Sequence, residues 1–500
     1  VYNAHSLLET GKDEHSNTWP IHFQSFNDYK PGLYFYLVMP FVKVFGLNEW
    51  AVRIPGATLG VGTVFLVWLL VKELFPDKKW LPEISAIFLA ISPWHLHFSR
   101  GGWEANAGTF FMALGFWGFL KSTKKQKWLL VSAISWIAAL YTYHSARIVV
   151  PLLALGLLIK FRKAVLGKNK KVFFATLVMS LVLILPLAKD LLGPAGISRA
   201  SGVGLLADLG PTSKTDEQRG EHDNPTSLST KLLHNKGVNY GLAFARNYME
   251  HFDGNFLFIS GDLIQRNKVP EMGTMYMFDL IFLIAGLLAI AKNGKGWFPI
   301  LLWLVVAPIP AALTFQSPHA LRAQNMIVPL TVISAYGLWN IATWLQRLKN
   351  NHGLFVICHL SFVIFIFWDF TRYLHNYYVH MPKTYDYSSQ YGVKELVLFT
   401  KEQANNKQFL VTTRYDQPYI LFLFYLKYPP DKFQAEHSLT SRDKFGFSTV
   451  ESFDRYSFGL DSDWETTIAK YPKYTIAGSP EEVPDGANVS KEIYFPSGRT

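Results

Sequence analysis

A carboxylate and an ammonium group, Asp28 and Lys30, stand just before an apolar run that begins at Leu33. They lie in the stretch NDYKPG, where Pro31 cannot continue a helix and Gly32 loosens the backbone, so we expect the charged pair on a turn. Such a pair beside an apolar segment is suited to a ligand with a polar head and an apolar tail. The alternative is a solvated loop from which Lys30 reaches the membrane interface.

Three further polar clusters stand at the ends of apolar runs. They are Arg100 and Glu104 in SRGGWEAN, His144 and Arg147 in YTYHSARI, and His319 and Arg322 in SPHALRAQN. Residues four apart face one another on a continuous helix, but Gly101 and Gly102 interrupt the first cluster. Charged groups at the mouth of a membrane span are costly and are often functional. The alternatives are a helix-end ion pair, an interfacial aromatic belt with a snorkelling arginine, and a structural histidine.

Together these clusters predict a cationic site. Lys30 and the three arginines would lie on one side of a membrane, where guanidinium and ammonium groups bind phosphate well. We expect Lys30, Arg100, Arg147, His319 and Arg322 to contact the phosphate of an anionic lipid head group. Other polar residues of the same regions are expected to contact substrate: Tyr29, His144, Asp13 and Glu14.

The composition is that of a membrane protein with a soluble part. The chain has 500 residues, of which 50% are hydrophobic and 16% aromatic, and long apolar runs end near residue 372. The net charge of +11 comes from basic clusters between apolar runs, which argues against nucleic-acid binding. Cys358 is the single cysteine, so no intrachain disulfide can form. No P-loop, GxSxG, CxxC or HExxH motif supports nucleotide, serine-hydrolase or zinc-protease chemistry.

Apolar periodicity and length predict about ten membrane spans. They cover residues 52–75, 83–98, 104–120, 128–143, 147–161, 172–189, 274–291, 297–315, 324–345 and 354–370. The shorter run Leu33–Phe45 is expected to form an interfacial or re-entrant helix. The whole fold is therefore predicted to be mainly α.

Lysine and arginine clusters between these spans predict the orientation. If the spans alternate, one side receives Lys78, Lys79, Lys121, Lys124, Lys125, Lys127, Lys160, Arg162, Lys163, Lys168, Lys170, Lys171, Lys292, Lys295, Arg347 and Lys349. Because cytoplasmic loops are rich in such residues, the opening loop (1–50), the loop 190–273 and the C-terminal residues should be extracytoplasmic.

Long apolar runs end near residue 372, and the sequence after them is polar. This change predicts a multi-span domain at 1–372 and a soluble α/β domain at 373–500. In the latter we expect an amphipathic helix at 392–403, buried strands at 408–413 and 474–477, and a packed helix at 419–426. The loop 190–273 is predicted to contain a helix near 231–251. Its Arg246, His251 and Asp253 are expected either to bind substrate or to order the loop.

The motifs resemble those of the GT-C membrane glycosyltransferases. The segments NAHSLLETGKDEHSNTWPIHFQSFNDYKPGLYFY, GLNEWAVRIPGA, ISPWHLHFSRGGWEAN and HALRAQNMIVPLTVISAYGL are similar to the protein O-mannosyltransferase group and to the lipid A aminoarabinose transferases. The resemblance covers about the first 370 residues. It implies a plasma-membrane enzyme that moves a sugar from a polyprenyl-phosphate carrier to a protein, lipid or glycan acceptor, with inversion, on the extracytoplasmic face.

The resemblance also implies roles for particular residues. Lys30 matches the family's Lys-Pro position at the carrier phosphate, Arg100 and Glu104 match an arginine and acidic residue at a span mouth, and His319 and Arg322 match less closely. The family's principal catalytic acid and first span would lie upstream of Val1, so Asp13 and Glu14 are not its counterparts. Gly32 stands where relatives often have a second proline.

The expected chemistry follows from the leaving group. Cleavage of a sugar–phosphate bond builds negative charge on the phosphate, which fixed cations stabilise. The acceptor hydroxyl needs a base on the opposite face of the sugar, as in inverting glycosidases, and Asp28 or Glu104 could support it. Converging carboxylates could also hold a divalent cation.

Two other functions are compatible with the same sequence. A multi-pass transporter or flippase of lipid-linked sugars would require charges deep within the spans and symmetry between the halves, but the charges lie mainly at the ends of spans and no repeat is evident. A non-catalytic membrane scaffold would leave the polar clusters far apart.

Overall fold

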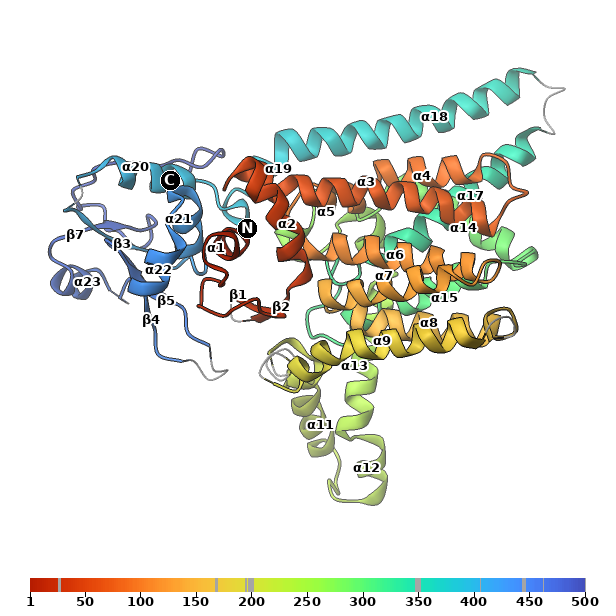
Figure 1. Ribbon diagram of the computed structural model, residues 1–500, viewed down its shortest axis with the longest axis horizontal. Coiled ribbons are helices and arrows are strands. Elements are labelled where there is room, and N and C mark those ends of the chain that lie inside the picture. Colours follow the sequence, from red (N-terminus) through yellow and green to blue (C-terminus); the bar gives the residue numbers. More distant parts are fainter. Residues whose placement is uncertain are drawn as a thin grey trace. The chain divides into compact units, whose positions relative to one another are not determined.

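A computed structural model describes residues 1–25, 28–166, 170–193, 196, 202–346, 352–404, 406–442, 447–461 and 463–499 (Figure 1). The chain divides into two compact units. Unit one comprises Val1–Pro55 with Tyr378–Thr500, and unit two comprises Gly56–Tyr377. The second boundary lies close to the predicted one at 372/373, whereas the opening residues belong with the C-terminal ones. The predicted positions Asn27, Lys168, Arg347 and Lys349 lie outside the described residues.

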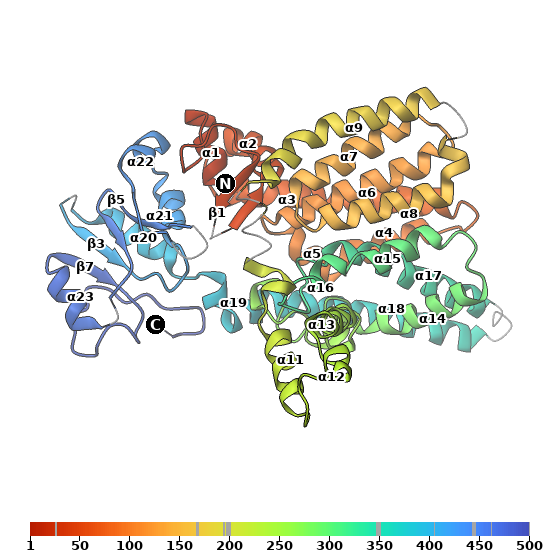
Figure 2. The same cartoon turned by 90° about the horizontal axis from the view of Figure 1, so that it is seen from below.

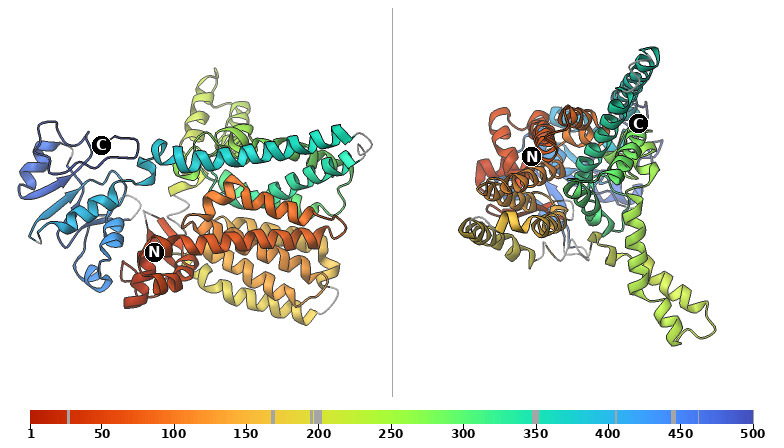
Figure 3. Two further views of the ribbon diagram at one scale, coloured as in Figure 1. Left: turned by 90° about the horizontal axis from the view of Figure 1, so that it is seen from above. Right: turned by 90° about the vertical axis from the view of Figure 1, so that its right-hand side faces the viewer.

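Unit two is built from long apolar helices that run alongside one another (Figures 1 and 3). Its helices are α3 (Glu49–Leu74, which starts in unit one), α4 (Leu81–Ile91), α5 (Pro93–Ser99), α6 (Glu104–Ser122), α7 (Trp128–Thr142), α8 (Ala146–Leu166), α9 (Lys170–Leu191), α14 (Met277–Lys292), α15 (Phe298–Val306), α16 (Ile309–Ala312), α17 (Ile327–Leu345) and α18 (His352–His375). Each of the ten predicted spans is helical. Four helical segments are long and apolar enough to cross a membrane, at Glu49–Leu74, Lys170–Leu191, Gln324–Leu345 and Val356–Thr384.

Two of the predicted spans are each broken into two helices. Pro93 starts a new helix after Ser92, and Pro308 follows the end of α15, because proline cannot donate the backbone hydrogen bond that would continue the helix. The carbonyl groups released there find side-chain donors. Tyr276 Oη donates to the Ile91 carbonyl (2.7 Å), and Asn325 Nδ2 donates to the Ala307 carbonyl (3.5 Å).

The lysine-rich connections of unit two are tied to one another. Lys121 and Lys124 both pair with Glu73 at the end of α3, the Lys124 contact being 2.5 Å. Trp339 Nε1 donates to the Lys79 carbonyl (2.8 Å). These bonds join connections that the alternation of spans predicts on one side, while the cellular orientation stays a prediction.

Three α-helices lie within the described residues of the loop between α9 and α14. They are α11 (Gly210–Gly220), α12 (Leu228–Leu233) and α13 (Lys236–Glu250), and they project from the helical body of unit two (Figure 3). The side chain of Asn235 caps α13 by accepting from the Val238 amide (3.0 Å). The predicted helix near 231–251 is therefore confirmed.

Unit one begins with α1 (Tyr2–Thr10), the hairpin strands β1 (His22–Ser25) and β2 (Asp28–Pro31), and α2 (Leu33–Phe45). The expected turn at Asp28 and Lys30 is wrong, because both belong to β2, which pairs with β1 in antiparallel register. Pro31 is tolerated as the last residue of a two-stranded ladder. Residues two apart on a strand share a face, so Asp28 and Lys30 remain on one side of β2.

The C-terminal part of unit one is the predicted α/β domain (Figure 2). Its sheet has the order β4-β5-β6-β3-β7, with β4 (Ser438–Leu439), β5 (Val450–Phe453), β6 (Tyr456–Phe458), β3 (Gln408–Val411) and β7 (Tyr474–Ala477). Its helices are α19 (Met381–Thr384), α20 (Val393–Glu402), α21 (Tyr419–Leu426), α22 (Pro430–Glu436) and α23 (Trp464–Lys470). The expectation that 474–477 is buried is wrong, because β7 is an edge strand and is half-buried.

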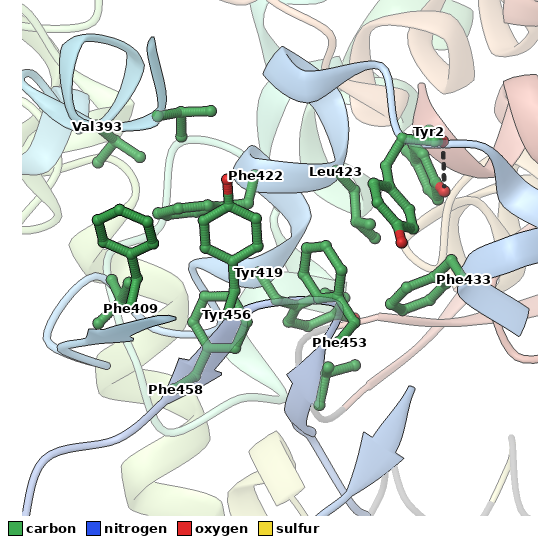
Figure 4. Packing of buried hydrophobic residues seen from close by; sticks show 14 of the residues in the cluster. Tyr2, Val393, Phe409, Tyr419, Phe422, Leu423, Phe433, Phe453, Tyr456 and Phe458 are labelled. Atoms are coloured by element: carbon green, nitrogen blue, oxygen red, sulfur yellow. Dashed lines mark hydrogen bonds between the residues drawn. The ribbon is translucent and has the colours of Figure 1, made fainter. Parts of the chain in front are cut away.

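Aromatic side chains form the core of this domain. Phe422 and Tyr456 pack edge to face with ring centroids 5.0 Å apart, and Phe453 and Phe458 stack at 5.8 Å (Figure 4). Tyr2 from α1 joins this core and donates from Oη to the Tyr428 carbonyl (3.0 Å). The opening helix is therefore an integral part of the α/β domain's packing.

Candidate functional site

The hairpin β1–β2 positions Lys30. The ladder pairs Lys30 with Phe23, whose side chain is fully buried. The Gly32 amide donates to the Ile21 carbonyl (2.8 Å), and a Cβ at Gly32 would lie 2.6 Å from that same oxygen. A proline at this position would lose the hydrogen bond and clash with the Ile21 carbonyl.

Tyr29 and the carboxylates of the opening loop also lie in unit one. The Tyr29 ring is 5.5 Å from that of Phe447. Asp13 is buried and its Oδ1 accepts from the amides of His15 (2.9 Å) and Asn17 (2.8 Å), so it orders the loop. Glu14 accepts from Asn3 Nδ2 (3.1 Å), and burial raises the pKa of its carboxyl group.

Arg100 and Glu104 are not one turn apart on a continuous helix. Helix α5 ends at Ser99 and α6 begins at Glu104, with the glycine pair in the turn between them. The Arg100 guanidinium lies over the Tyr377 ring at 4.6 Å from its centroid. Glu104 occupies the first turn of α6, where the helix dipole stabilises a negative charge.

The three polar clusters of unit two are joined by hydrogen bonds. Trp94 Nε1, in the segment before Arg100, donates to the Ala320 carbonyl (3.0 Å). Ser145, in the turn between α7 and α8, donates from Oγ to the Arg322 carbonyl (2.9 Å). The structure thus brings together the segments around residues 94–106, 144–147 and 319–324. The roles of the candidate residues stay predictions.

His144 and Arg147 contact one another directly. Arg147 Nη1 donates to His144 Nδ1 (3.0 Å), and its Nε donates to the Leu140 carbonyl at the end of α7 (3.2 Å). The guanidinium can only donate, so the His144 ring nitrogen is the acceptor of this bond. The guanidinium is consequently held at the junction of α7 and α8.

His319 and Arg322 are both buried. Arg322 Nη1 donates to Thr314 Oγ1 (2.8 Å), and Nη2 donates to Gln316 Oε1 (3.3 Å). These bonds fix the guanidinium against its own connecting segment. His319 Nδ1 lies 3.7 Å from Asp262 Oδ2.

Asp262 is a central residue that the sequence reasoning missed. It is fully buried, and it accepts from the amides of Ala320 (2.6 Å) and Ile264 (2.8 Å) and from Asn267 Nδ2 (3.0 Å). Burial raises the pKa of its carboxyl group, and the hydrogen bonds oppose that shift. The only signal in the sequence was its position in the long loop, because no spacing relates Asp262 to residue 320.

His251 hydrogen-bonds to the segment that contains His319 and thereby helps to order the loop. Its Nδ1 donates to the Asn247 carbonyl (2.8 Å), and its Nε2 accepts from the His319 amide (3.2 Å). Burial lowers the pKa of this imidazole to about 4, so the ring is neutral at physiological pH. Of the two readings that the sequence left open for His251, these contacts support ordering of the loop.

The residues of the expected cationic cluster belong to two different units. Lys30 belongs to unit one, whereas Arg100, Arg147 and Arg322 belong to unit two, so the approach of Lys30 to these arginines stays a prediction. Within the described ranges, no group of three or more His, Cys, Asp or Glu side chains is placed to hold a metal ion. The divalent cation stays a prediction.

Comparison with known proteins shows which part of the chain resembles a known family. Residues 29–188 match the family of dolichyl-phosphate-mannose-protein mannosyltransferases. YycA of Bacillus subtilis (strain 168), a candidate mannosyltransferase, is 32% identical over 158 residues, which make up 31% of this chain and 22% of YycA. YkcB of the same organism is 33% identical over 91 residues, or 18% of this chain and 12% of YkcB. The chain thus matches less than a quarter of the length of these relatives.

Solved structures with a similar arrangement are more distant in sequence. The oligosaccharyltransferase AglB from Archaeoglobus fulgidus, in complex with an inhibitory peptide and a dolichol-phosphate, is 15% identical with a TM-score of 0.49, covering 85% of this chain and 59% of AglB. ArnT from Cupriavidus metallidurans, bound to undecaprenyl phosphate, is 10% identical with a TM-score of 0.48. The match covers 86% of this chain and 79% of ArnT. The family match and the Bacillus relatives confirm that this chain resembles the membrane mannosyltransferases, as its span-end motifs predict.

Proposed function

We propose that this protein is a membrane glycosyltransferase that moves a sugar from a polyprenyl-phosphate carrier to an acceptor hydroxyl, with inversion, on the extracytoplasmic face. One observation carries the proposal furthest. Three span ends that bear Arg100 and Glu104, His144 and Arg147, and His319 are bonded together in unit two. The family match over residues 29–188 includes the first two of these pairs and Lys30.

In this proposal the cations act on the leaving group. Negative charge grows on the departing phosphate, and Lys30 and Arg100 stabilise it most directly. The Arg147 guanidinium, held by Leu140 and His144, would reinforce the same charge. Arg322 is bonded to Thr314 and Gln316, which suits it to positioning the 319–324 segment. Asp28 and Glu104 would support the base that activates the acceptor.

The acidic residues within the predicted spans favour the transferase over the transporter alternative, because their side chains have structural partners. Asp279 accepts from the Tyr276 amide (3.1 Å), and Asp369 accepts from the Phe278 amide (3.1 Å). Both carboxylates therefore cap the start of α14, and this structural task accounts for their place in an apolar body. Neither needs a transported ion as its partner.

A donor-cleavage assay tests the proposal. The full-length protein, in lipid nanodiscs, is given polyprenyl-phosphate mannose and a membrane acceptor fraction, and released polyprenyl phosphate is measured. We expect Lys30→Ala and Arg100→Ala to lower the rate constant by about 100-fold each, as loss of one charge-stabilising donor does elsewhere. Lys30→Arg should retain more activity than Lys30→Ala because it keeps the charge.

Lys43→Ala is the matched control, since Lys43 is an exposed cation on α2 in the same unit. It should cleave the donor at the wild-type rate. If Lys30→Ala and Arg100→Ala did so as well, the assigned phosphate contacts would be wrong. If no variant and no wild-type preparation cleaved any polyprenyl-phosphate sugar, the function itself would be wrong.

A further inference from the structure

Unit two has a groove outside the segments assigned to the donor. It lies where the turn 268–271 meets the start of α14 and the last turns of α18, and it has a volume of about 590 Å³. Its lining combines two cations, one carboxylate and apolar side chains: Lys268, Arg372, Glu271, Phe258, Ile259, Met277 and Ser260. The helices α14 and α18 that bound it pack against one another (Figure 2).

The walls of the groove are held by specific bonds. Arg372 Nη2 donates to the Glu271 carbonyl (2.8 Å), and Asn376 Nδ2, one turn later, donates to the Pro270 carbonyl (3.1 Å). The opposite wall is anchored by the Met275 amide, which donates to the Leu257 carbonyl (2.6 Å). The cavity is consequently a built feature of the fold, and both Arg372 and Lys268 line it.

Lys268 in the groove is a cation without a hydrogen-bond or ion-pair partner among the described residues, although its side chain is half-buried. Burial lowers the pKa of this ammonium group, while the negative charge of Asp262 opposes that shift. With Arg372 and Glu271 the lining has a net charge of +1, which favours an anion between the two cations.

An apolar track leads away from the groove. Met277, Leu280, Ile281, Ile284 and Leu288 are all exposed, and their spacing places them on one face of α14. Ile259, in the groove wall, is also 58% exposed. A soluble anion would contact only the groove, whereas a molecule with a charged head and alkyl chains would contact both the groove and this apolar face of α14.

We propose that the groove binds the phosphodiester of an anionic glycerophospholipid from the bilayer, with its acyl chains along α14. Lys268 and Arg372, which both line the groove, hold the phosphate, and the lipid thereby completes the junction of the loop with α14 and α18. This bound lipid is neither donor nor acceptor of the proposed transfer. Its binding is measured without any sugar carrier, so it can fail independently of the proposed function.

Lipid retention measured by native mass spectrometry tests this inference. Full-length protein is equilibrated in nanodiscs of phosphatidylglycerol and phosphatidylcholine, and retained lipids are counted after release into detergent. We expect the wild type to retain one phosphatidylglycerol in preference to phosphatidylcholine. Lys268→Gln, which breaks no bond within the described chain, should lower that retention by about tenfold, and Lys268→Gln with Arg372→Gln should abolish it.

Lys295→Gln is the matched control, because Lys295 is an exposed lysine beyond the opposite end of α14. It should retain the lipid as the wild type does. Equal retention by Lys268→Gln and Lys295→Gln would overturn the site. Displacement of the lipid by millimolar inorganic phosphate or by polyprenyl phosphate would also overturn it, by assigning the groove to a soluble anion or to the sugar carrier.

Discussion

The C-terminal domain and the span ends of unit two are stabilised in opposite ways. The domain has an interior of stacked and edge-to-face aromatic rings, built around Phe422, Phe453 and Tyr456. The span ends instead have buried polar groups, with Asp262 and His251 tying a long loop to residues 319 and 320. Water drives the burial of apolar surface in a soluble domain, whereas lipid gives helices no such drive, so hydrogen bonds specify their arrangement.

The largest effect is expected from the aromatic core. Phe422→Ala removes a fully buried ring and should lower the free energy of unfolding of the C-terminal domain by about 3–5 kcal/mol. Chemical denaturation followed by the fluorescence of Trp464, the tryptophan of this domain, would measure it. Leu398→Ala, at a 43% exposed position, is the control and should cost little. Comparable losses for both would mean that the ring cluster is not the main source of stability.

A substitution at Asp262 tests the buried polar groups at the span ends of unit two, and its expected effect is nearly as large. Asp262→Asn places an amide among three donors and should lower the free energy of unfolding by about 3 kcal/mol, because a charged acceptor is lost from a buried site. Limited proteolysis of the loop 190–273 in detergent would reveal the loosened segment. Asp223→Asn, on the exposed part of that loop, should leave the cleavage rate unchanged. If the loop of Asp262→Asn were cleaved at the wild-type rate, Asp262 would not anchor the loop.

The smallest effect is a dependence on pH. The pKa of His251 is about 4 in the folded protein and lies near 6.5 in an unfolded chain, so the unfolded state binds a proton first as the pH falls. Stability should therefore be complete above pH 6.5 and decline between pH 6.5 and 4, by about 1 kcal/mol over the first pH unit below 6.5. Proteolysis of the loop at pH 7 and 5.5 would measure the change. His251→Gln should show a weaker acceleration, and identical pH profiles would exclude this histidine as the cause.

The helical body of the fold could be read from the sequence with some accuracy. Long apolar runs identify spans directly, and short loops rich in turn residues mark their ends. The helix Tyr419–Leu426 and the strand Tyr474–Ala477 were also placed correctly. The strands β4, β5 and β6 were missed, because serine and glutamate residues interrupt their short apolar patterns.

The candidate site was harder to predict. Charged residues at span ends could be named, since charge is rare in an apolar stretch. Their contacts could not, because Ser145 and Arg322 are 177 positions apart and no periodicity relates them. Asp262 was missed for the same reason, and Lys30 was assigned to a turn because the strand partner of NDYKPG, His22–Ser25, is short and weakly patterned.

The broken helix at Ser92 has a consequence for how the protein is made. The Ile91 carbonyl, exposed by the break, finds its donor in Tyr276, which the ribosome adds 185 residues later. Until then that oxygen has to be satisfied by water, by lipid head groups or by a helper protein, since hydrocarbon offers no donor. The Ile91 carbonyl can therefore gain this donor only after Tyr276 has been synthesised.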